Sequence, residues 1–316
     1  MQPERSPTST FRRSSVDTVN ASRLLERARW GFFAVAADDG RRRRYARWLE
    51  ALDRREVAVR RLAVAGLPPP PEPVDPDVGF VVASPDASWD IIGVTEQVRQ
   101  LADNMPAADL HDKPYLLDLR LDILPAESPL ARLAFNRTVV ATASAYLGMV
   151  PRLAGVTVLR SPYVAGPPRG SQLFHSDWED IRQLKLFVNC SDVMSRDGPL
   201  SALRAAASAQ VKRVLHYRYG GRGFRRGDDE VLALAKPDDL RSFEGPAGTA
   251  VFLDTSACLH YGSRLQEGAP DRLVVQMQFL RPSAFNLVFR RAPSLAIAGT
   301  RPSAAWAALV APQVTP

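Results

Sequence analysis

The side chains of this chain best suited to chemistry are His175 and Asp177, with His260 far downstream. If 175–177 is a strand, the side chains at i and i+2 point to the same face, because side chains alternate along a strand. A histidine on a second strand would then complete three ligands on one side of an octahedral metal ion. Two histidines and one carboxylate, with open positions opposite them, are typical of non-haem Fe(II) oxygenases. The spacing therefore predicts a metal site made of His175, Asp177 and His260.

The sequence around these residues adds further features in a definite order. They are the segment 172–180 that carries H-x-D, the apolar stretch 184–193, the Gly-Pro-Leu turn at 198–200, the stretch 248–255, His260, and the stretch 271–279 that begins with Asp-Arg. This ordering resembles the phytanoyl-CoA dioxygenase-like family of Fe(II)/2-oxoglutarate oxygenases over about residues 153 to 282. The resemblance implies a double-stranded β-helix that uses Fe(II), 2-oxoglutarate as co-substrate and O2.

Arg272 is the predicted partner of the distal carboxylate of 2-oxoglutarate. A guanidinium group binds a carboxylate through two parallel hydrogen bonds and stays charged in a dry pocket. Arg264, four residues after His260, is the competitor. Arg272 is preferred because an apolar stretch follows it directly, so its side chain is expected to point into the barrel. Gln172, Thr255 and Ser263 are predicted to supply further hydroxyl or amide contacts to the co-substrate.

The resemblance implies hydroxylation of an unactivated C–H bond of a small molecule, coupled to decarboxylation of 2-oxoglutarate to succinate. Related halogenases replace the carboxylate ligand by a small residue, so the presence of Asp177 favours hydroxylation. Candidate substrates are a secondary metabolite, a lipid-linked sugar or an acyl derivative. Two other classes stay open. One is a non-catalytic jelly-roll protein that binds or senses a ligand, and the other is a metal-dependent hydrolase, which would not need Arg272.

Each residue has a simpler interpretation when it is taken alone. An H-x-D triplet also occurs on the solvent face of a strand, and a single histidine or arginine is most often an ordinary core or surface residue. His111 precedes Pro114 in a polar turn, and His216 lies in a basic, Gly-rich segment, so neither is expected to be a ligand. The metal-site prediction therefore depends on the combination and its order along the chain.

The fold class expected is α+β, with a double-stranded β-helix (jelly-roll, cupin-like) core, supporting helices and an N-terminal helical hairpin. The predicted divisions are a disordered leader (1–18), a basic helical hairpin (19–67), a Pro-rich spacer (68–77), the oxygenase domain (78–290) and a C-terminal tail (291–316). Within the oxygenase domain, strands are predicted at 78–83, 115–124 and 156–160, and helices at 95–105 and 130–147.

The hairpin is predicted to consist of helices at 22–37 and 41–65. In the second helix, apolar side chains recur at helical spacing with arginines on the other faces; they are Tyr45, Trp48, Leu49, Leu52 and Leu62. Residues 1–66 hold 15 arginines against 8 acidic residues, which accounts for the whole net charge of +7. The arginines are expected either to be solvated around a packed hairpin or to form a basic surface for an anionic membrane or a phosphorylated substrate. No motif indicates nucleic-acid binding.

The remaining composition favours a protein of the cytoplasm. No apolar run has transmembrane length, and the first residues do not resemble a secretory signal. Cys190 and Cys258 fall in predicted strands and are expected to be small buried side chains, not a disulfide. The Gly-, Arg- and aromatic-rich stretch 217–227 lies within the long connection from 200 to 248. It is expected to be either an active-site lid that favours an anionic or polyhydroxylated substrate or a flexible solvated loop.

Overall fold

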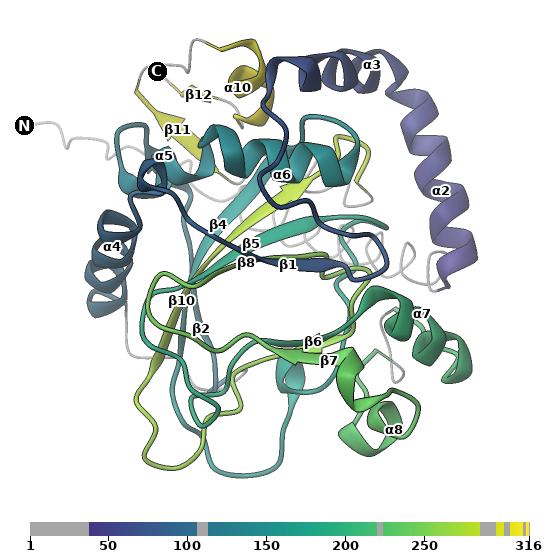
Figure 1. Cartoon of the computed structure of the whole chain (residues 1–316), viewed down its shortest axis with the longest axis vertical. Coiled ribbons are helices and arrows are strands. Elements are labelled where there is room, and N and C mark those ends of the chain that lie inside the picture. Colours follow the sequence, from purple (N-terminus) through teal and green to yellow (C-terminus); the bar gives the residue numbers. More distant parts are fainter. Residues whose placement is uncertain are drawn as a thin grey trace, which may run out of the picture.

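The computed structural model describes residues 38–105, 113–219, 224–284, 295–299, 304–311 and 314–315. Within this part of the chain, a large antiparallel sheet lies between helices on one side and a small antiparallel sheet on the other (Figure 1). The expected α+β class with antiparallel sheets is confirmed. The predicted leader 1–18, the predicted helix 22–37 and His111 lie outside the described residues.

Six strands form the large sheet, each antiparallel to its neighbours, in the order β1-β8-β5-β10-β4-β2. Their bounds are β1 Phe80–Ala83, β8 Ala250–Leu253, β5 Leu184–Asn189, β10 Arg272–Leu280, β4 Arg152–Ser161 and β2 Leu117–Arg120. The small sheet has the order β7-β6-β9, with bounds Leu240–Ser242, Ser201–Leu203 and His260–Tyr261. The predicted strand 115–124 is wrong as one element, because β2 and β3 (Ile123–Pro125) belong to different sheets.

Alternation along β5 and β10 divides the interior into two apolar layers. Leu186 and Val188 of β5 pack with Met277 of β10 in the core beneath the helices. Phe187 of β5 and Val274 of β10 point the other way and pack towards the small sheet. Successive strand residues face opposite sides of a sheet. Lys185 and Asn189 of β5 therefore share the face of Phe187, which is the face that borders the site described below.

Three helices cover the other face of the large sheet, namely α4 (Ile91–Asp103), α5 (Pro129–Ala134) and α6 (Arg137–Leu147) (Figure 1). The single helix predicted at 130–147 is wrong, because Asn136 interrupts it. The Asn136 side chain accepts hydrogen bonds from the backbone N–H groups of Thr138 and Val139, so it caps α6 and ends α5 before it. Gly148, at φ 73°, ends α6 in the left-handed region that suits glycine.

The N-terminal part of the described chain forms two helices, α2 (Asp39–Leu52) and α3 (Arg54–Ala63), in place of the one helix predicted at 41–65. The predicted apolar stripe is also wrong in part. Leu49 is buried, whereas Trp48, Leu52 and Leu62 are 54%, 60% and 77% exposed. Two arginines take the buried positions instead, since Arg42 and Arg60 are 1% and 4% exposed. Arg60 donates to the backbone carbonyls of Val150, Pro151 and Leu309, which explains its burial.

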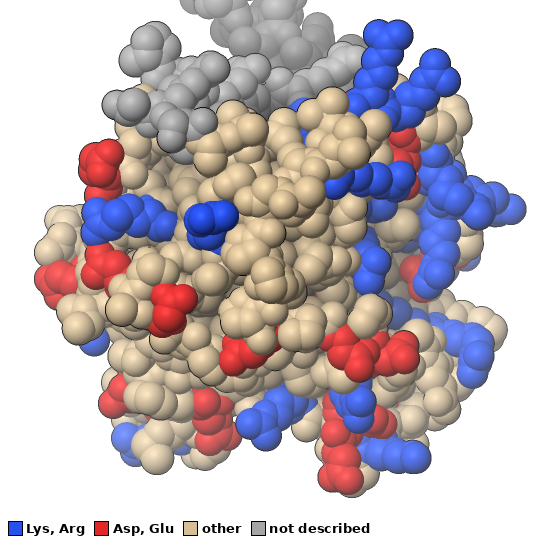
Figure 2. All heavy atoms as spheres, turned by 45° about the horizontal axis from the view of Figure 1, so that its top comes forward, with Lys and Arg blue, Asp and Glu red and all other residues tan. Residues whose placement is uncertain are grey.

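The other arginines of α2 and α3 are exposed and form a basic surface; they are Arg41, Arg43, Arg44, Arg47, Arg54, Arg55 and Arg61. Figure 2 shows blue side chains gathered on this side of the molecule, to the right. Contact between this surface and an anionic membrane stays a prediction. Among the described residues, no helix combines the length and the apolar character that crossing a bilayer requires.

The segment predicted as a C-terminal tail contributes to the fold. It carries β11 (Ala296–Ala298), α10 (Ala305–Val310) and β12 (Val314–Thr315). β11 lies parallel to both β3 and β12, and together they form a third, three-stranded sheet. Leu295, Ile297 and Val310 are buried in the core that the helices share with the large sheet. This segment therefore packs against the domain.

Asp254 is a buried acid that follows β8 and holds the next turn. Its Oδ1 atom accepts hydrogen bonds from the backbone N–H groups of Ser256 and Ala257 at 2.8 and 2.9 Å. Its Oδ2 atom accepts from the Tyr146 hydroxyl at 2.8 Å. Burial raises the pKa of Asp254 to about 6, above its usual value of 3.8. The native protein therefore binds this proton more tightly than the unfolded chain does.

Asp254→Asn is expected to change how stability depends on pH. Between about pH 4 and pH 6 the native state of the wild type holds more protons than the unfolded state, so its stability falls as pH rises through that window. The variant has no proton to lose and keeps an oxygen for both N–H groups. The difference between the free energies of unfolding of the variant and the wild type should therefore shift in favour of the variant by on the order of 2 to 3 kcal/mol from pH 4 to pH 7. Urea unfolding at both pH values measures this, and a difference that does not vary with pH would contradict it.

Candidate metal centre

His175, Asp177 and His260 meet where the segment after β4 runs beside β9. A short helical turn, Gly170–Gln172, precedes the segment, and His175 forms an isolated antiparallel bridge with His260 through hydrogen bonds of 3.0 and 2.9 Å. The Asp177 N–H donates to the carbonyl of Thr255 at 2.7 Å. The H-x-D triplet was predicted on a regular strand, and this is wrong because only His175 makes a bridge. The local extension is still enough to place His175 and Asp177 on one side.

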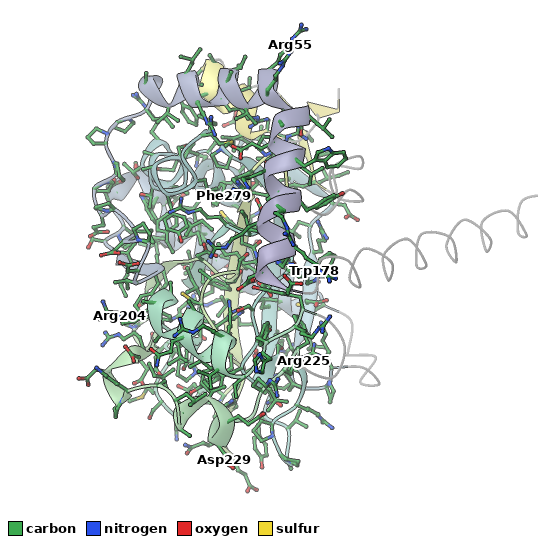
Figure 3. All side chains as sticks on the ribbon, turned by 90° about the vertical axis from the view of Figure 1, so that its right-hand side faces the viewer. Arg55, Trp178, Arg204, Arg225, Asp229 and Phe279 are labelled. Atoms are coloured by element: carbon green, nitrogen blue, oxygen red, sulfur yellow. The ribbon has the colours of Figure 1, made fainter. Side chains whose placement is uncertain are left out.

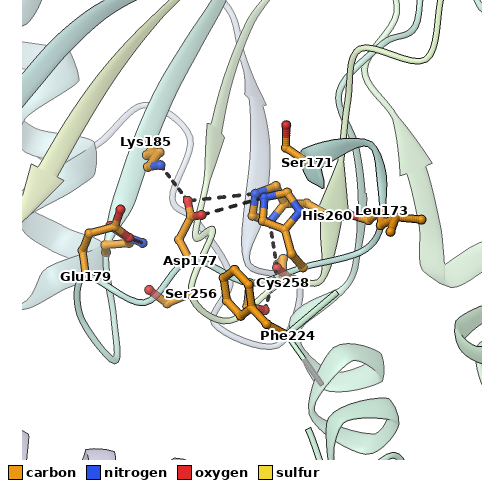
Figure 4. A network of polar contacts seen from close by, with 12 residues as sticks. Ser171, Leu173, Asp177, Glu179, Lys185, Phe224, Ser256, Cys258 and His260 are labelled. Atoms are coloured by element: carbon orange, nitrogen blue, oxygen red, sulfur yellow. Dashed lines mark hydrogen bonds and ion pairs between the residues drawn. The ribbon is translucent and has the colours of Figure 1, made fainter. Parts of the chain in front are cut away.

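The three side chains present their ligand atoms to one another. One potential ligand atom from each lies within 4.8 Å of the others. The Nε2 atom of His175 is 3.9 Å from Oδ1 of Asp177, and Nε2 of His260 is 4.0 Å from Oδ2. The imidazole centroids are 4.3 Å apart. Figure 4 shows Asp177 between Lys185 and the imidazole of His260. The arrangement can hold one metal ion with three protein ligands from one side.

Both imidazoles are prepared to bind a metal through Nε2. Nδ1 of His175 lies 2.9 Å from the carbonyl of Leu173, and Nδ1 of His260 lies 3.1 Å from the carbonyl of Cys258. A carbonyl only accepts, so each Nδ1 carries the proton and each Nε2 has a free lone pair. Burial lowers the pKa of His175, and burial together with the neighbouring His175 lowers that of His260 to about 3. Neutral imidazoles are the form that binds metals, so the donor set fits a divalent ion.

Lys185 contacts the triad and was not among the predicted site residues. Its Nζ atom lies 2.6 Å from Oδ2 of Asp177. Burial alone would raise the pKa of Asp177, but the Lys185 ammonium and the two imidazoles outweigh it and hold that pKa well below its usual range. The carboxylate is therefore ionised and able to bind a metal. The signal in the sequence was a single lysine inside the apolar stretch 184–188, one of only four lysines in the chain.

Arg272 is a buried cation at the start of β10, and 5% of it is exposed. Its Nη2 atom donates to the hydroxyl of Ser263 at 3.2 Å. Within the described residues its Nε atom has no partner, and no carboxylate pairs with it. Burial lowers the pKa of Arg272 to about 10. Ser263, which also contacts Ser161 through its hydroxyl at 2.9 Å, therefore orients a guanidinium that has free donors.

Arg264, the competing arginine, is already neutralised. Its two terminal nitrogens lie 2.7 and 2.8 Å from the carboxylate oxygens of Asp228, and its guanidinium stacks 3.5 Å from the ring centroid of Tyr261. Among the described residues, Arg264 thus has a carboxylate partner and Arg272 has none. A role for Arg272 in binding a co-substrate carboxylate stays a prediction.

Gln172 and Thr255 lie behind the wall of the site. Nε2 of Gln172 donates to the carbonyl of Ser263 at 2.6 Å, and its Oε1 accepts from the N–H of Arg169 at 3.1 Å. The hydroxyl of Thr255 is buried without a hydrogen-bond partner among the described residues, and its carbonyl holds the N–H of Asp177. Their predicted contacts with the co-substrate remain predictions, and the observed contacts are with the backbone that carries the site.

A cavity of about 770 Å³ opens over the triad and Arg272. Its polar, uncharged lining comes from Thr157 of β4, Asn189 of β5 and Gln276 of β10, and its aromatic lining includes Trp178, Phe187 and Phe224. Within the described residues, Asn189 has a buried Nδ2 atom without a partner. The exposed His216, expected not to be a ligand, does not line this cavity.

The long connection predicted to contain a lid includes several regular elements. After β6 it forms α7 (Ala205–Val214), α8 (Asp228–Leu232) and β7, while residues 220–223 lie outside the described part. Of the residues of the 217–227 stretch that the structure describes, Phe224 and Arg225 line the cavity. The Tyr217 hydroxyl accepts from the N–H of Ser176 at 2.9 Å and donates to the carbonyl of Phe224 at 2.8 Å. Tyr217 therefore ties the described part of this stretch to the metal-binding segment, and its role as an active-site lid stays a prediction.

Arg42 of α2 fixes the backbone that follows Asp177. Its Nη2 atom donates to the carbonyls of Trp178 and Asp180 at 3.2 and 3.0 Å, and its guanidinium lies 3.7 Å above the ring of Tyr219. Figure 3 shows Trp178 beside the beginning of α2. On the other side, the Asp180 carboxylate pairs with Arg281 at 2.6 and 2.9 Å. The segment after Asp177 is thus held by two buried arginines.

Arg42→Met is expected to lower the free energy of unfolding by about 2 to 4 kcal/mol, since it leaves two carbonyls without their charged donor and removes a cation–π contact. Arg44→Met is the matched control, because Arg44 is exposed on the same helix and should change stability by less than about 0.5 kcal/mol. Urea denaturation of both variants measures the difference. Equal stability of the two would show that Arg42 does not anchor the segment.

Two histidines and one carboxylate in an antiparallel α+β fold therefore define the class of site, a candidate metal centre of the two-histidine, one-carboxylate type. No protein-family model matches the chain, and no curated protein matches it either. Among solved structures, the chain is similar to the epimerase SnoN in complex with Fe3+, alpha-ketoglutarate and nogalamycin RO, at 16% identity and a TM-score of 0.48, covering 69% of this chain and 86% of SnoN.

Two further structures show similar values. HygX from Streptomyces hygroscopicus, with nickel and 2-oxoglutarate bound, is 20% identical with a TM-score of 0.45, covering 65% of this chain and 84% of HygX. EctD from S. alaskensis with bound Fe is 18% identical with a TM-score of 0.48, covering 66% of this chain and 74% of EctD.

Proposed function

We propose that the chain is an Fe(II)- and 2-oxoglutarate-dependent dioxygenase that hydroxylates a small molecule. The observation that carries the proposal is the pairing of two features in one cavity, the triad of His175, Asp177 and His260 and the buried, unpaired cation of Arg272. A metal site alone fits many reactions. A guanidinium with free donors beside it fits a co-substrate that carries a second carboxylate.

In this function, His175, Asp177 and His260 hold the iron, and Arg272 binds the distal carboxylate of 2-oxoglutarate. When bound, iron and 2-oxoglutarate supply the activation of O2 that oxidises an unactivated C–H bond. The protein buries His175 and His260, leaves Asp177 partly exposed to the cavity, and orients the co-substrate through Arg272, which Ser263 holds. The presence of the Asp177 carboxylate supports hydroxylation as the outcome. A hydrolase on the same fold would have no use for Arg272.

The proposal includes a double-stranded β-helix core of the phytanoyl-CoA dioxygenase-like type, supported by the order of motifs along the chain. The cavity lining supports a substrate that carries hydroxyl groups and an apolar portion, because Thr157, Asn189 and Gln276 offer hydrogen bonds beside Trp178 and Phe187. Cys190 and Cys258 are buried free thiols, which supports a reducing, cytoplasmic location.

Fe(II)-dependent formation of succinate from 2-oxoglutarate tests the proposal without knowledge of the substrate. Many oxygenases of this type turn over 2-oxoglutarate slowly on their own, so the wild type is expected to produce succinate when Fe(II), 2-oxoglutarate and O2 are all present. Omission of any one, or His260→Ala, should reduce the product to background. A ligand-binding protein without catalytic activity would bind the same components but form no succinate, even after addition of a library of hydroxylated small molecules. That result would contradict the proposal.

A further inference from the structure

Lys185 introduces a positive charge into the metal centre from the floor of the cavity. It lies on β5, shares with Phe187 and Asn189 the face that lines the cavity, and is 7% exposed. Its Nζ atom is 2.6 Å from Oδ2 of Asp177, the carboxylate that the proposed function assigns to the metal. A buried ammonium this close to a metal ligand must either compete with the metal or share the carboxylate with it.

The two oxygens of Asp177 are not equivalent. Oδ2 accepts a charge-assisted hydrogen bond from Lys185, whereas among the described residues no protein donor contacts Oδ1, which lies 3.9 Å from Nε2 of His175. A carboxylate fixed in this way offers one oxygen to a metal ion and keeps the other on the lysine. Lys185 thus sets which oxygen of Asp177 is available.

The described side chains that line the cavity carry no surplus of negative charge to offset a metal ion. The cavity is lined by two buried cations, Lys185 and Arg272, and by the carboxylates of Asp177 and Glu179. Lys113 and Asp118 form their own ion pair at 3.9 Å, and Arg225 is exposed. A divalent metal ion therefore adds two uncompensated positive charges in a poorly solvated site, where like charges repel strongly. A dicarboxylate dianion restores the balance.

We propose that Lys185 is a positioning residue that restricts Asp177 to one-oxygen ligation and, through its charge, makes metal binding weak until the dianionic co-substrate enters. This inference rests on the proposed function, since it takes the triad as the metal site and 2-oxoglutarate as the dianion. The consequence is a reciprocal coupling, because 2-oxoglutarate must raise metal affinity by the same factor by which metal raises affinity for 2-oxoglutarate.

Titration with Mn(II), in which electron paramagnetic resonance measures the free Mn(II), tests the coupling between metal and 2-oxoglutarate binding without any catalytic turnover. In the wild type, a saturating concentration of 2-oxoglutarate is expected to tighten Mn(II) binding by on the order of tenfold or more. Lys185→Met, which keeps the length and apolar stem of the side chain, should bind Mn(II) on the order of tenfold more tightly than the wild type when 2-oxoglutarate is absent. 2-Oxoglutarate should also raise the Mn(II) affinity of this variant by a smaller factor than in the wild type, and the part of the coupling that comes from direct contact of 2-oxoglutarate with the metal should remain.

Two further variants complete the design. Lys185→Arg keeps the charge and should retain the coupling between Mn(II) and 2-oxoglutarate. Lys113 lines the same cavity but pairs with Asp118, so Lys113→Met should leave the Mn(II) affinity and the coupling unchanged. If Lys185→Met is poorly folded, Lys185→Gln replaces it. If the Met or Gln variant has the Mn(II) affinity and the coupling of the wild type, the role of Lys185 is overturned and the proposed function is not. A folded wild type that binds no Mn(II) would instead overturn the proposed function, and this inference with it.

Discussion

His260→Ala is expected to lower the affinity for Fe(II) by at least about 100-fold, because partners one shell further from a metal are already worth about 10- to 100-fold. The variant removes one of three ligands and leaves no buried charge behind. Asp177→Asn should lower the affinity similarly, but it also leaves Lys185 without its counter-ion at 2.6 Å. Breaking such a buried pair costs about 3 to 5 kcal/mol of stability, so the histidine variant gives the cleaner test.

Competition with a chromogenic Fe(II) chelator under anaerobic conditions measures both affinities. His216→Ala is the control, since His216 is exposed and away from the cavity, and its loss should not change the affinity. Equal Fe(II) affinity in the wild type and the His260→Ala variant would show that the metal binds elsewhere. Loss of affinity in the His216→Ala variant would point to the same conclusion.

Arg272→Met is expected to weaken 2-oxoglutarate binding by about 2 to 5 kcal/mol, which corresponds to roughly 30-fold or more in affinity. The same variant should raise the free energy of unfolding of the protein without ligands by on the order of 1 to 3 kcal/mol. The reason is that burial lowers the pKa of Arg272 to about 10 and no carboxylate among the described residues compensates its charge. Gain of stability with loss of binding is the signature of a residue kept for a ligand.

Arg264→Met is the matched control, because Arg264 lies in the segment between β9 and β10, close to the same site. It breaks the two hydrogen bonds to Asp228 and the stacking on Tyr261, so it should lower stability and leave 2-oxoglutarate affinity nearly unchanged. Isothermal titration with metal-loaded protein gives the affinities, and urea unfolding gives the stabilities. Loss of stability in Arg272→Met with unaltered binding would make Arg272 a structural residue and Arg264 the better candidate.

The sequence predicted the candidate site better than the fold around it. His175 and Asp177 lie two residues apart in an extended segment, so alternation alone places them together, and the motif order adds His260 from a distant segment. The apolar stretches around 184–189 and 272–280 are strands as expected, because both of their faces are buried. Arg272 was preferred over Arg264 for the strand that follows it, and the structure gives it the free donors.

The features that the sequence did not predict depend on interactions between segments far apart in the chain. Lys185 contacts Asp177 only because β5 lies under the cavity, and a lysine in an apolar stretch does not reveal its partner. Arg42 and Arg60 are buried because carbonyls from distant loops meet them, which helical periodicity does not show. The break at Asn136 depends on one side chain that caps a helix where the apolar pattern continues.

Anaerobic titration of the metal-free protein with Fe(II) and 2-oxoglutarate tests whether the triad and Arg272 bind iron and 2-oxoglutarate together. Iron that binds 2-oxoglutarate through two oxygens gives a visible charge-transfer band, and no substrate is needed. We expect a band in the wild type, no band in His260→Ala, a weaker band at equal ligand concentration in Arg272→Met and an unchanged band in Arg264→Met. A well-folded wild type that binds Fe(II) and 2-oxoglutarate without this band, or binds neither, would contradict the proposed function.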